Sequence, residues 1–472
     1  MSSRSWLWLC WFVLAFGVLN VYGPPPEDRL QQDVSSSASE PSKLKAAFDV
    51  FLTLQRGGQD AERYFAYANA LLGRPYSPQY VLPTEDARGL ATPSGDRLVQ
   101  AARPLLPWRD FSVEYPPGML LSAVVPALFT TNFETYFLLF CIEMEVMLTI
   151  AVALAVWTAD ALTPGAGRRA LGLSIALTLA LGCIAVRRYD ASVALTIAAA
   201  VYGMATRRPI FAAVFLALGV VLKGAPMLMA PIMLFWFAAR RDWRGLAFGA
   251  ASGTLCLAAA GVAYLSIAGP HAIDAFAYHA DRPLQIETLY GGALMLLEPS
   301  FSNLVSLTYS YGSHNVVSAA EPWLRWAAGG LEIAALLAVY AASYIRIRDA
   351  ADDRNRLIAV VWAASACFVA FMSVGKVFSA QYLTWLLPLG AVAGAATAGR
   401  SWRRLLLANA LTQADYPLLY GFVVINFPAT APLWGAIVVA RTVALWSWIA
   451  TLFGERATAL SPSNDPQRPC GE

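Results

Sequence analysis

A polar stretch after the first apolar run carries the residue types of a proton-transfer site. Asp60 and Tyr64 are four residues apart and share one face of a helix, whereas Asp60 and Glu62 would point roughly 200° apart. A carboxylate within hydrogen-bond reach of a hydroxyl can remove its proton, so we expect Asp60 to be a general base and Glu62 a supporting acid. The alternative is that Asp60 only caps a helix over 61–72, which Gly73 would end.

Basic residues at the ends of later apolar segments are suited to bind an anion. Arg187 and Arg188 precede one such segment, Lys223 ends another, and Lys376 precedes a third. Lys and Arg bind phosphate through charge-assisted hydrogen bonds, which are stronger at the edge of a low-dielectric region. We interpret the four cations together as a phosphate site. The alternative for each one is a charged head that reaches water while its stem packs on apolar neighbours.

The elements that position these residues are apolar helices. The chain has 472 residues, of which 58% are hydrophobic and only 14% are charged, whereas soluble domains carry about 25% charged residues. Many segments approach the roughly 20 apolar residues that cross a bilayer as a helix. The chain contains no P-loop, Rossmann fingerprint or zinc-protease motif, and its six cysteines lack Cys-x-x-Cys spacing. The composition predicts an all-α polytopic membrane protein. The net charge of +3 says nothing about nucleic acid, and we expect no nucleic-acid partner.

We predict about 12 transmembrane helices. The first is an anchor within 1–22, and the others follow the first long polar region. They are expected at 134–158, 170–186, 190–206, 208–222, 225–239, 243–266, 323–347, 356–374, 380–398, 402–424 and 429–453.

The short apolar run 118–131 decides the orientation of these spans. It is too short for a comfortable crossing and suits an interfacial helix. If it does not cross, the arginine clusters of the short loops all fall on the side of Arg4, which the positive-inside rule makes cytoplasmic. Both termini are then cytoplasmic and two long loops are extracytoplasmic. The predicted order is the anchor 1–22, the first outer loop 23–133, spans 134–266, the second outer loop 267–322, spans 323–453 and a cytoplasmic tail 454–472.

Ionisable residues inside the predicted spans need partners or a cavity, because isolated charges are costly there. Asp415 and Arg441 lie on adjacent antiparallel spans and are expected to form a buried structural pair. Glu143 and Glu145 would suit a proton relay in a transporter. We find no internal repeat and no matched pair of broken spans that would support a transporter.

Seven short motifs follow one another between residues 60 and 417. They are Asp60-x3-Tyr64 with Gly73-x-Pro75-Tyr76, Tyr115-Pro116-Pro117, Arg188-Tyr189-Asp190, Lys223-x-x-Pro226, Tyr278-His279-x-Asp281-Arg282 with Gln285-x-Glu287, Lys376-x-x-Ser379-x-Gln381-Tyr382-x-x-Trp385, and Gln413 before Tyr416-Pro417. The arrangement is similar to the GT-C superfamily of membrane glycosyltransferases. It most resembles the polyprenol-phosphate mannosyltransferases of glycosyltransferase family 87.

The resemblance implies the GT-C fold, a catalytic acid in the first outer loop, a lipid-phosphate sugar donor and an inverting transfer. Asp60 would be the catalytic base, with Glu62 beside it. The donor phosphate would be held by Arg188, Lys223, His279, Arg282 and Lys376. The sugar and acceptor pocket would be lined by Tyr64, Tyr189, Asp190, Gln285, Glu287, Gln381, Tyr382 and Trp385. Such a donor requires no cofactor, although Asp190 and Glu62 could together ligate a divalent ion.

The expected function is transfer of a hexose, with mannose as the expected sugar, from a polyprenyl phosphate to a glycolipid or glycan. The reaction would take place on the extracytoplasmic face of the plasma membrane, with the lipid bilayer as a partner. One alternative is a transporter or flippase of a lipid-linked glycan, which needs no base in the first loop. Another is a transferase of the O-antigen ligase or polymerase type, which would use a diphosphate donor.

Overall fold

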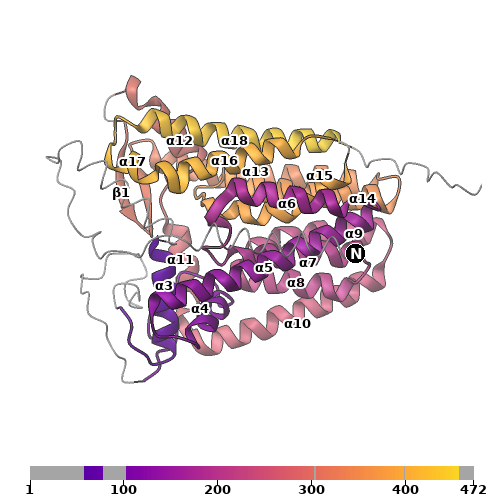
Figure 1. Cartoon of the computed structure of the whole chain (residues 1–472), viewed down its shortest axis with the longest axis horizontal. Coiled ribbons are helices and arrows are strands. Elements are labelled where there is room, and N and C mark those ends of the chain that lie inside the picture. Colours follow the sequence, from indigo (N-terminus) through magenta and orange to yellow (C-terminus); the bar gives the residue numbers. More distant parts are fainter. Residues whose placement is uncertain (1–57, 78–102, 302–303, 398, 456–472) are drawn as a thin grey trace, which may run out of the picture.

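A computed structural model describes residues 58–77, 103–301, 304–397 and 399–455 of the chain. The predicted anchor 1–22, the polar linker that follows it and the tail after residue 455 lie outside this part. The described residues are mostly helical, with one antiparallel hairpin of β1 (Ser306–Ser310) and β2 (Ser313–Val317). Figure 1 shows long helices side by side in a bundle, with α3, α11 and the hairpin gathered at one end.

Each of the 11 apolar segments predicted after the first loop contains helix in the structure. The helices are α5 (Phe133–Leu162), α6 (Gly167–Leu181), α7 (Asp190–Ala205), α8 (Pro209–Lys223), α9 (Ala230–Ala239), α10 (Trp243–Ala268), α13 (Glu321–Arg348), α14 (Asp353–Val374), α15 (Leu386–Ala396), α16 (Trp402–Gln413) with α17 (Tyr420–Ile425), and α18 (Ala431–Gly454). Among the described residues, six helical segments are long and apolar enough to cross a membrane. The protein is therefore a multi-pass membrane protein, and the total of 12 spans stays a prediction.

Several of the shorter apolar helices are interrupted at the end of the bundle that carries the hairpin. Short irregular helices occur there: η3 (Gly182–Ala185), η4 (Ala225–Met229), η7 (Ala380–Trp385) and η8 (Ala414–Leu419). Gly224 adopts a φ of +72° before η4, and Pro417 lies inside η8. A residue with positive φ ends the α-helix, and proline removes a backbone donor. The breaks therefore place turns rather than continuous helix at this end of the bundle.

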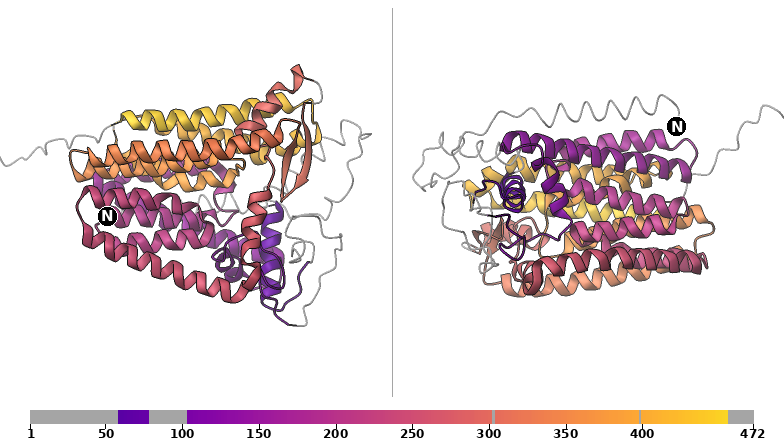
Figure 2. Two further views of the ribbon diagram at one scale, coloured as in Figure 1. Left: turned by 180° about the vertical axis from the view of Figure 1, so that it is seen from behind. Right: turned by 90° about the horizontal axis from the view of Figure 1, so that it is seen from below.

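Helix α3 (Gly58–Leu71) lies across the end of the bundle, transverse to the long helices (Figure 2). Gly73 has a φ of +66°, and Arg74 N donates to Asn69 O at 2.8 Å, so the predicted helix end is confirmed. Asp60 lies within the helix rather than at its cap, so the capping alternative is wrong. The buried Tyr64 ring anchors α3 by packing against the ring of Tyr189 and against two other rings.

The predicted interfacial segment forms a helix of only nine residues, α4 (Met119–Ala127). At a rise of 1.5 Å per residue it is about 14 Å long, half of the ~30 Å hydrocarbon core of a bilayer. One of its faces packs in the core, while Leu121 is exposed, and Phe129 just after the helix is 75% exposed. The short length and exposed apolar side chains suit a position at the membrane surface.

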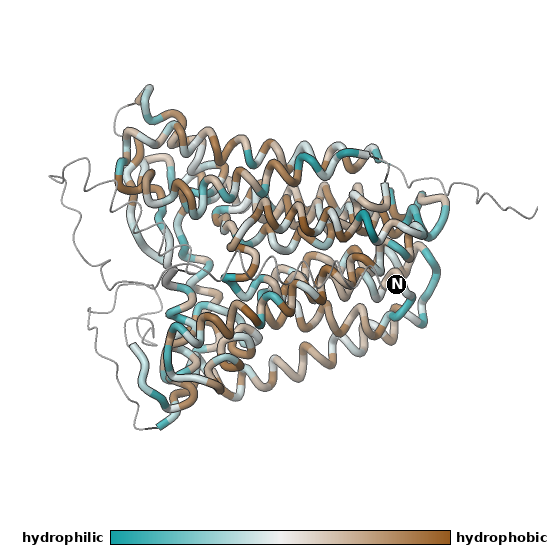
Figure 3. Tube along the Cα trace, viewed as in Figure 1, coloured by the Kyte–Doolittle hydropathy of each residue, from teal (hydrophilic) through white to brown (hydrophobic). Residues whose placement is uncertain are grey.

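The arginine-rich loops meet at the end of the bundle away from the hairpin. Arg207 pairs with Asp353 at 3.0 Å, and Arg240 also pairs with Asp353. Arg354 donates to Thr163 Oγ1 at 2.6 Å. The apolar middles of the helices lie between two more hydrophilic ends (Figure 3). The structure thus places these clusters on one face, as the positive-inside argument requires.

Two short helices near the hairpin form part of the second long loop. They are α11 (Asp274–Asp281) and α12 (Leu289–Leu297), joined by residues 282–288 and preceded and followed by η5 (Gly269–Ile273) and η6 (Glu298–Ser300). Helix α12 packs along α18. In α18, Arg441 donates to Asp415, and both side chains are fully buried, which confirms the predicted pair.

Candidate active site

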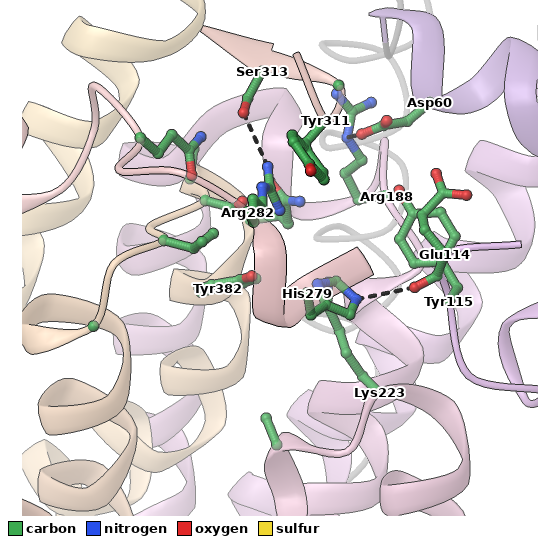
Figure 4. Close-up of a pocket in the computed structure, with 18 of the residues that line it drawn as sticks. Asp60, Glu114, Tyr115, Arg188, Lys223, His279, Arg282, Tyr311, Ser313 and Tyr382 are labelled. Atoms are coloured by element: carbon green, nitrogen blue, oxygen red, sulfur yellow. Dashed lines mark hydrogen bonds and ion pairs between the residues drawn. The ribbon is translucent and has the colours of Figure 1, made fainter. Parts of the chain in front are cut away.

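A cavity of about 410 Å³ lies at the end of the bundle where α3, α11 and the hairpin meet the broken helices (Figure 4). It brings together most of the predicted site residues from both outer loops and from the later turns. Those that line it are Asp60, Arg188, Tyr189, Lys223, His279, Arg282, Gln285, Glu287, Lys376, Gln381, Tyr382 and Trp385. Glu62, Tyr64 and Asp190 do not line it.

Asp60 faces the cavity in an ion pair with Arg188. Its Oδ2 lies 2.8 Å from Arg188 Nε, and the aspartate side chain is 23% exposed while the arginine side chain is 9% exposed. Arg188 also donates to Tyr416 Oη at 3.0 Å. The guanidinium is therefore held by groups from two other parts of the chain, and it orients the carboxylate.

Lys223 is committed to a buried carboxylate. Its Nζ lies 2.7 and 2.8 Å from the two carboxylate oxygens of Asp190, which also accepts a hydrogen bond from Trp385 Nε1 at 2.7 Å. The ammonium lies 4.7 Å from the centroid of Tyr189 and 5.1 Å from that of Tyr382, within reach of cation–π attraction. Asp190 and Lys223 thus join α7, α8 and η7 behind one wall of the cavity.

Glu114 is a cavity residue that the sequence analysis does not assign to the site. Its carboxylate pairs with Arg63 and accepts from Tyr67 Oη at 2.5 Å, and its carbonyl oxygen accepts from His279 Nε2 at 2.9 Å. Burial alone would lower the pKa of Arg63, but Glu114, together with Tyr67, Tyr115 and Tyr278, holds that pKa well above its ordinary value. The bond to the carbonyl uses the Nε2 hydrogen of His279. Glu114 therefore fastens α3 and α11 to the loop before α4.

Arg282 and Lys376 differ from the other cavity cations in their partners. Arg282 donates to Ser313 Oγ at 3.1 Å, and Lys376 donates to the carbonyl oxygen of Ala280 at 2.6 Å. Within the described part of the chain, neither has a carboxylate within ion-pair distance, and Arg282 Nε is buried without a hydrogen-bond partner. Their charges are available to an anion in the cavity.

Several lining residues lie outside the predicted set. They are Arg63, Glu114, Tyr115, Tyr278, Tyr311, Ser313, Glu332, Tyr416 and Tyr420, with others. Tyr115, Tyr278 and Tyr416 stand inside the quoted motifs, so the motifs contain a signal for them. Arg63 and Glu114 carry no such signal, because their pairing joins segments that are distant in sequence.

The metal alternative finds little support in the geometry. Both oxygens of Asp190 accept from Lys223. Over the residues that the structure describes, no group of three or more His, Cys, Asp or Glu side chains is arranged to hold a metal ion.

Comparisons with known proteins show which families and folds this chain is similar to. The sequence model of glycosyltransferase family 87 matches residues 113–292. The fold is similar to that of ArnT from Cupriavidus metallidurans bound to undecaprenyl phosphate, with 12% identity, a TM-score of 0.42, and coverage of 87% of this chain and 77% of that chain. The apo state of the same protein gives 12% identity, a TM-score of 0.41, and coverage of 87% and 76%. A comparison with curated proteins found no match.

The family match includes the Tyr-Pro-Pro, Arg-Tyr-Asp and Lys-x-x-Pro motifs and the segment from Tyr278 to Glu287. These are residues that the cavity brings together with Asp60. The resemblance predicted from the sequence is thereby confirmed over residues 113–292, where the chain is similar to the membrane glycosyltransferases of glycosyltransferase family 87.

Proposed function

We propose that the protein transfers a hexose, with mannose as the expected sugar, from a polyprenyl phosphate to a glycolipid or glycan, with inversion. The observation that carries the proposal is that one cavity holds the Asp60 carboxylate together with Arg282 and Lys376, two cations with no carboxylate partner in the described part of the chain. A glycosyl transfer from a lipid phosphate needs a proton acceptor and a site for the released phosphate. The GT-C architecture and an extracytoplasmic position of the cavity belong to the same proposal.

Asp60 is the proposed base. The acceptor hydroxyl forms a bond to the anomeric carbon of the sugar while its proton passes to the Asp60 carboxylate. Arg188 holds that carboxylate in place at the cavity, because Arg188 Nε donates to Oδ2. The bond between the anomeric carbon and the phosphate oxygen breaks in the same step, and the phosphate leaves with both electrons.

Arg282 and Lys376 are the proposed ligands of the leaving phosphate. Burial lowers the pKa of Lys376 below its ordinary value, and the partner that would offset this is an anion. Arg188 and Lys223 were expected in this role too, but each is already neutralised by a carboxylate, Asp60 and Asp190 respectively. They are better assigned to holding the walls of the cavity.

The cavity also has a side on which a lipid tail could leave. Its lining includes Phe276 of α11, Glu332 of α13 and Phe371 of α14, and Phe276 is 69% exposed. Helices α10 and α13 flank this side and belong to the least buried of the candidate spans. A polyprenyl chain leaving the phosphate site in this direction would meet the bilayer.

The test is transfer of label from radiolabelled polyprenyl-phosphate mannose in membranes that contain the full chain. We expect a labelled lipid or glycan product with the wild-type protein and a loss of roughly 10²–10⁴-fold with Asp60→Asn. Glu62→Gln is the matched control, because it removes the neighbouring carboxylate of α3 that does not line the cavity. Wild-type rates in Asp60→Asn would remove Asp60 as base. Label transfer only from a polyprenyl-diphosphate sugar would favour the ligase-type alternative.

A further inference from the structure

The backbone of segment 284–288, between α11 and α12, is hydrogen-bonded to three other parts of the chain. Val316 N donates to Leu284 O at 2.8 Å, and Gln285 N donates to Lys376 O at 3.2 Å. Trp434 Nε1 donates to Ile286 O at 3.1 Å. The segment therefore pairs with β2 through an isolated antiparallel bridge between Gln285 and Asn315, and it is hydrogen-bonded to the turn that carries Lys376.

The end of this segment is fixed from inside the bundle. Arg441 of α18 donates to the carbonyl oxygen of Glu287 as well as to Asp415. Thr288 Oγ1 accepts from Gly291 N at 3.0 Å and donates to Gln285 O at 2.7 Å, which caps α12. A rigid backbone of this kind presents its side chains in a set geometry.

The two side chains that this segment directs at the cavity are buried and polar. Gln285 is 3% exposed and Glu287 is 4% exposed, and both line the cavity. Gln285 Nε2 donates to Glu287 Oε2, while Gln285 Oε1 is buried without a hydrogen-bond partner among the described residues. A buried acceptor without a hydrogen-bond partner is destabilising. A ligand hydroxyl in the cavity would remove this cost.

The position of the pair next to the phosphate ligands indicates which part of a donor it would meet. Gln285 is hydrogen-bonded through its backbone to Lys376, and Arg282 lies three residues before it in the chain. Amide and carboxyl oxygens do not attract a phosphate, but they accept hydrogen bonds from sugar hydroxyls. Tyr189 Oη, which is likewise buried without a partner, belongs to the same cavity.

We infer that Gln285 and Glu287 form a subsite that recognises a hydroxyl group of the transferred sugar, beside the phosphate held by Arg282 and Lys376. This inference rests on the proposed function. It makes the pair a specificity determinant for neutral, hydroxyl-bearing hexoses. Asp60 acts on the acceptor, whereas the pair orients the donor.

The charge state of Glu287 fits this role. Burial, and next the nearby Asp415, raise the pKa of Glu287 above its ordinary value, and Arg441, Arg282 and the bond from Gln285 offset only part of that. Tyr416 and Tyr420 line the same cavity. A carboxyl group that keeps its proton can both donate to and accept from a hydroxyl. Glu287→Gln preserves this pattern, whereas Glu287→Ala removes it.

The test compares binding of lipids to the purified full chain in nanodiscs. The probes are undecaprenyl phosphate without sugar and the same lipid carrying mannose, glucose or galactose. We expect the wild-type protein to bind at least one sugar-bearing lipid about tenfold or more tightly than the sugar-free lipid. Gln285→Leu and Glu287→Ala should lose this preference and keep the affinity for the sugar-free lipid, and Glu287→Gln should keep both.

Three other results would overturn the subsite. Equal binding of all four lipids by the wild-type protein overturns the subsite and leaves the phosphate site standing. A preference retained in both Gln285→Leu and Glu287→Ala overturns the subsite as well. Failure of the wild-type protein to bind any of the lipids overturns the proposed function, and the subsite with it. The affinity for sugar-free lipid shows whether each variant is folded.

Discussion

Arg188 Nε lies 2.8 Å from Oδ2 of Asp60, so the turn before α7 is joined to helix α3. Burial would lower the pKa of Arg188, but Asp60 and the neighbouring tyrosines together raise it above its ordinary value, so the guanidinium stays charged. Tyr416 of η8 holds its other side. The pair fixes the position of the Asp60 carboxylate, for which we propose the role of proton acceptor, and it occupies Arg188 with a partner other than a phosphate.

Replacing Arg188 by Gln should reduce kcat for transfer by roughly 10–100-fold, because the Asp60 carboxylate loses its orienting donor. The kcat of Arg188→Lys should lie between those of the wild-type protein and Arg188→Gln, since an ammonium keeps the charge but not the planar donor geometry. Steady-state kinetics with varied donor concentration measure the effect. A rise in donor KM with unchanged kcat would instead identify Arg188 as a phosphate ligand.

Removing one partner of the Lys223–Asp190 pair should destabilise the protein strongly. The Asp190 side chain is almost fully buried, and an unpaired buried charge costs about 3–5 kcal/mol. We expect Lys223→Met and Asp190→Asn each to lower the thermal unfolding temperature, and the double variant to lose less than the sum of the two. Thermal unfolding in detergent provides the measurement. Strictly additive losses would show that the two side chains do not interact.

Neutralising the proposed phosphate ligands should weaken lipid binding without large loss of stability. Arg282→Gln and Lys376→Gln should each reduce the affinity for undecaprenyl phosphate by about tenfold, in line with about 1.5–3 kcal/mol for a hydrogen bond to a charged group. Arg325→Gln is the control, because Arg325 is an arginine near Asp281 that does not line the cavity. Equal affinities in all three variants would place the phosphate elsewhere.

Glu287 should make stability depend on pH in a defined direction. Its folded pKa is raised above the ordinary value of 4.5, so in the interval above 4.5 the native state keeps a proton that the unfolded state releases. The free energy of unfolding therefore falls as the pH rises through this interval. Unfolding temperatures between pH 5 and pH 8.5 should decline for the wild-type protein and decline less for Glu287→Gln. Parallel curves would assign the pH dependence to another group.

The sequence alone predicts the helical membrane architecture because the physical requirement is local. A span needs a continuous apolar run, and the runs at 134–158 and 356–374 became the helices α5 and α14. Gly73 ends α3 because glycine, which lacks a Cβ atom, adopts the positive φ found at this position without steric cost. The Asp415–Arg441 pair was also predictable, since two opposite charges on adjacent spans must meet to be tolerated in a membrane.

Only the tertiary structure decided which charges of the cavity are already paired. Arg188 and Lys223 look the same as Arg282 and Lys376 in the sequence, yet the first two face the carboxylates of Asp60 and Asp190. Pairing is a matter of a few ångströms between segments that are far apart along the chain, and no local pattern encodes that distance. Residue types and their order could therefore name the chemistry of the site. Contacts between distant segments determined which side chains remain available to perform it.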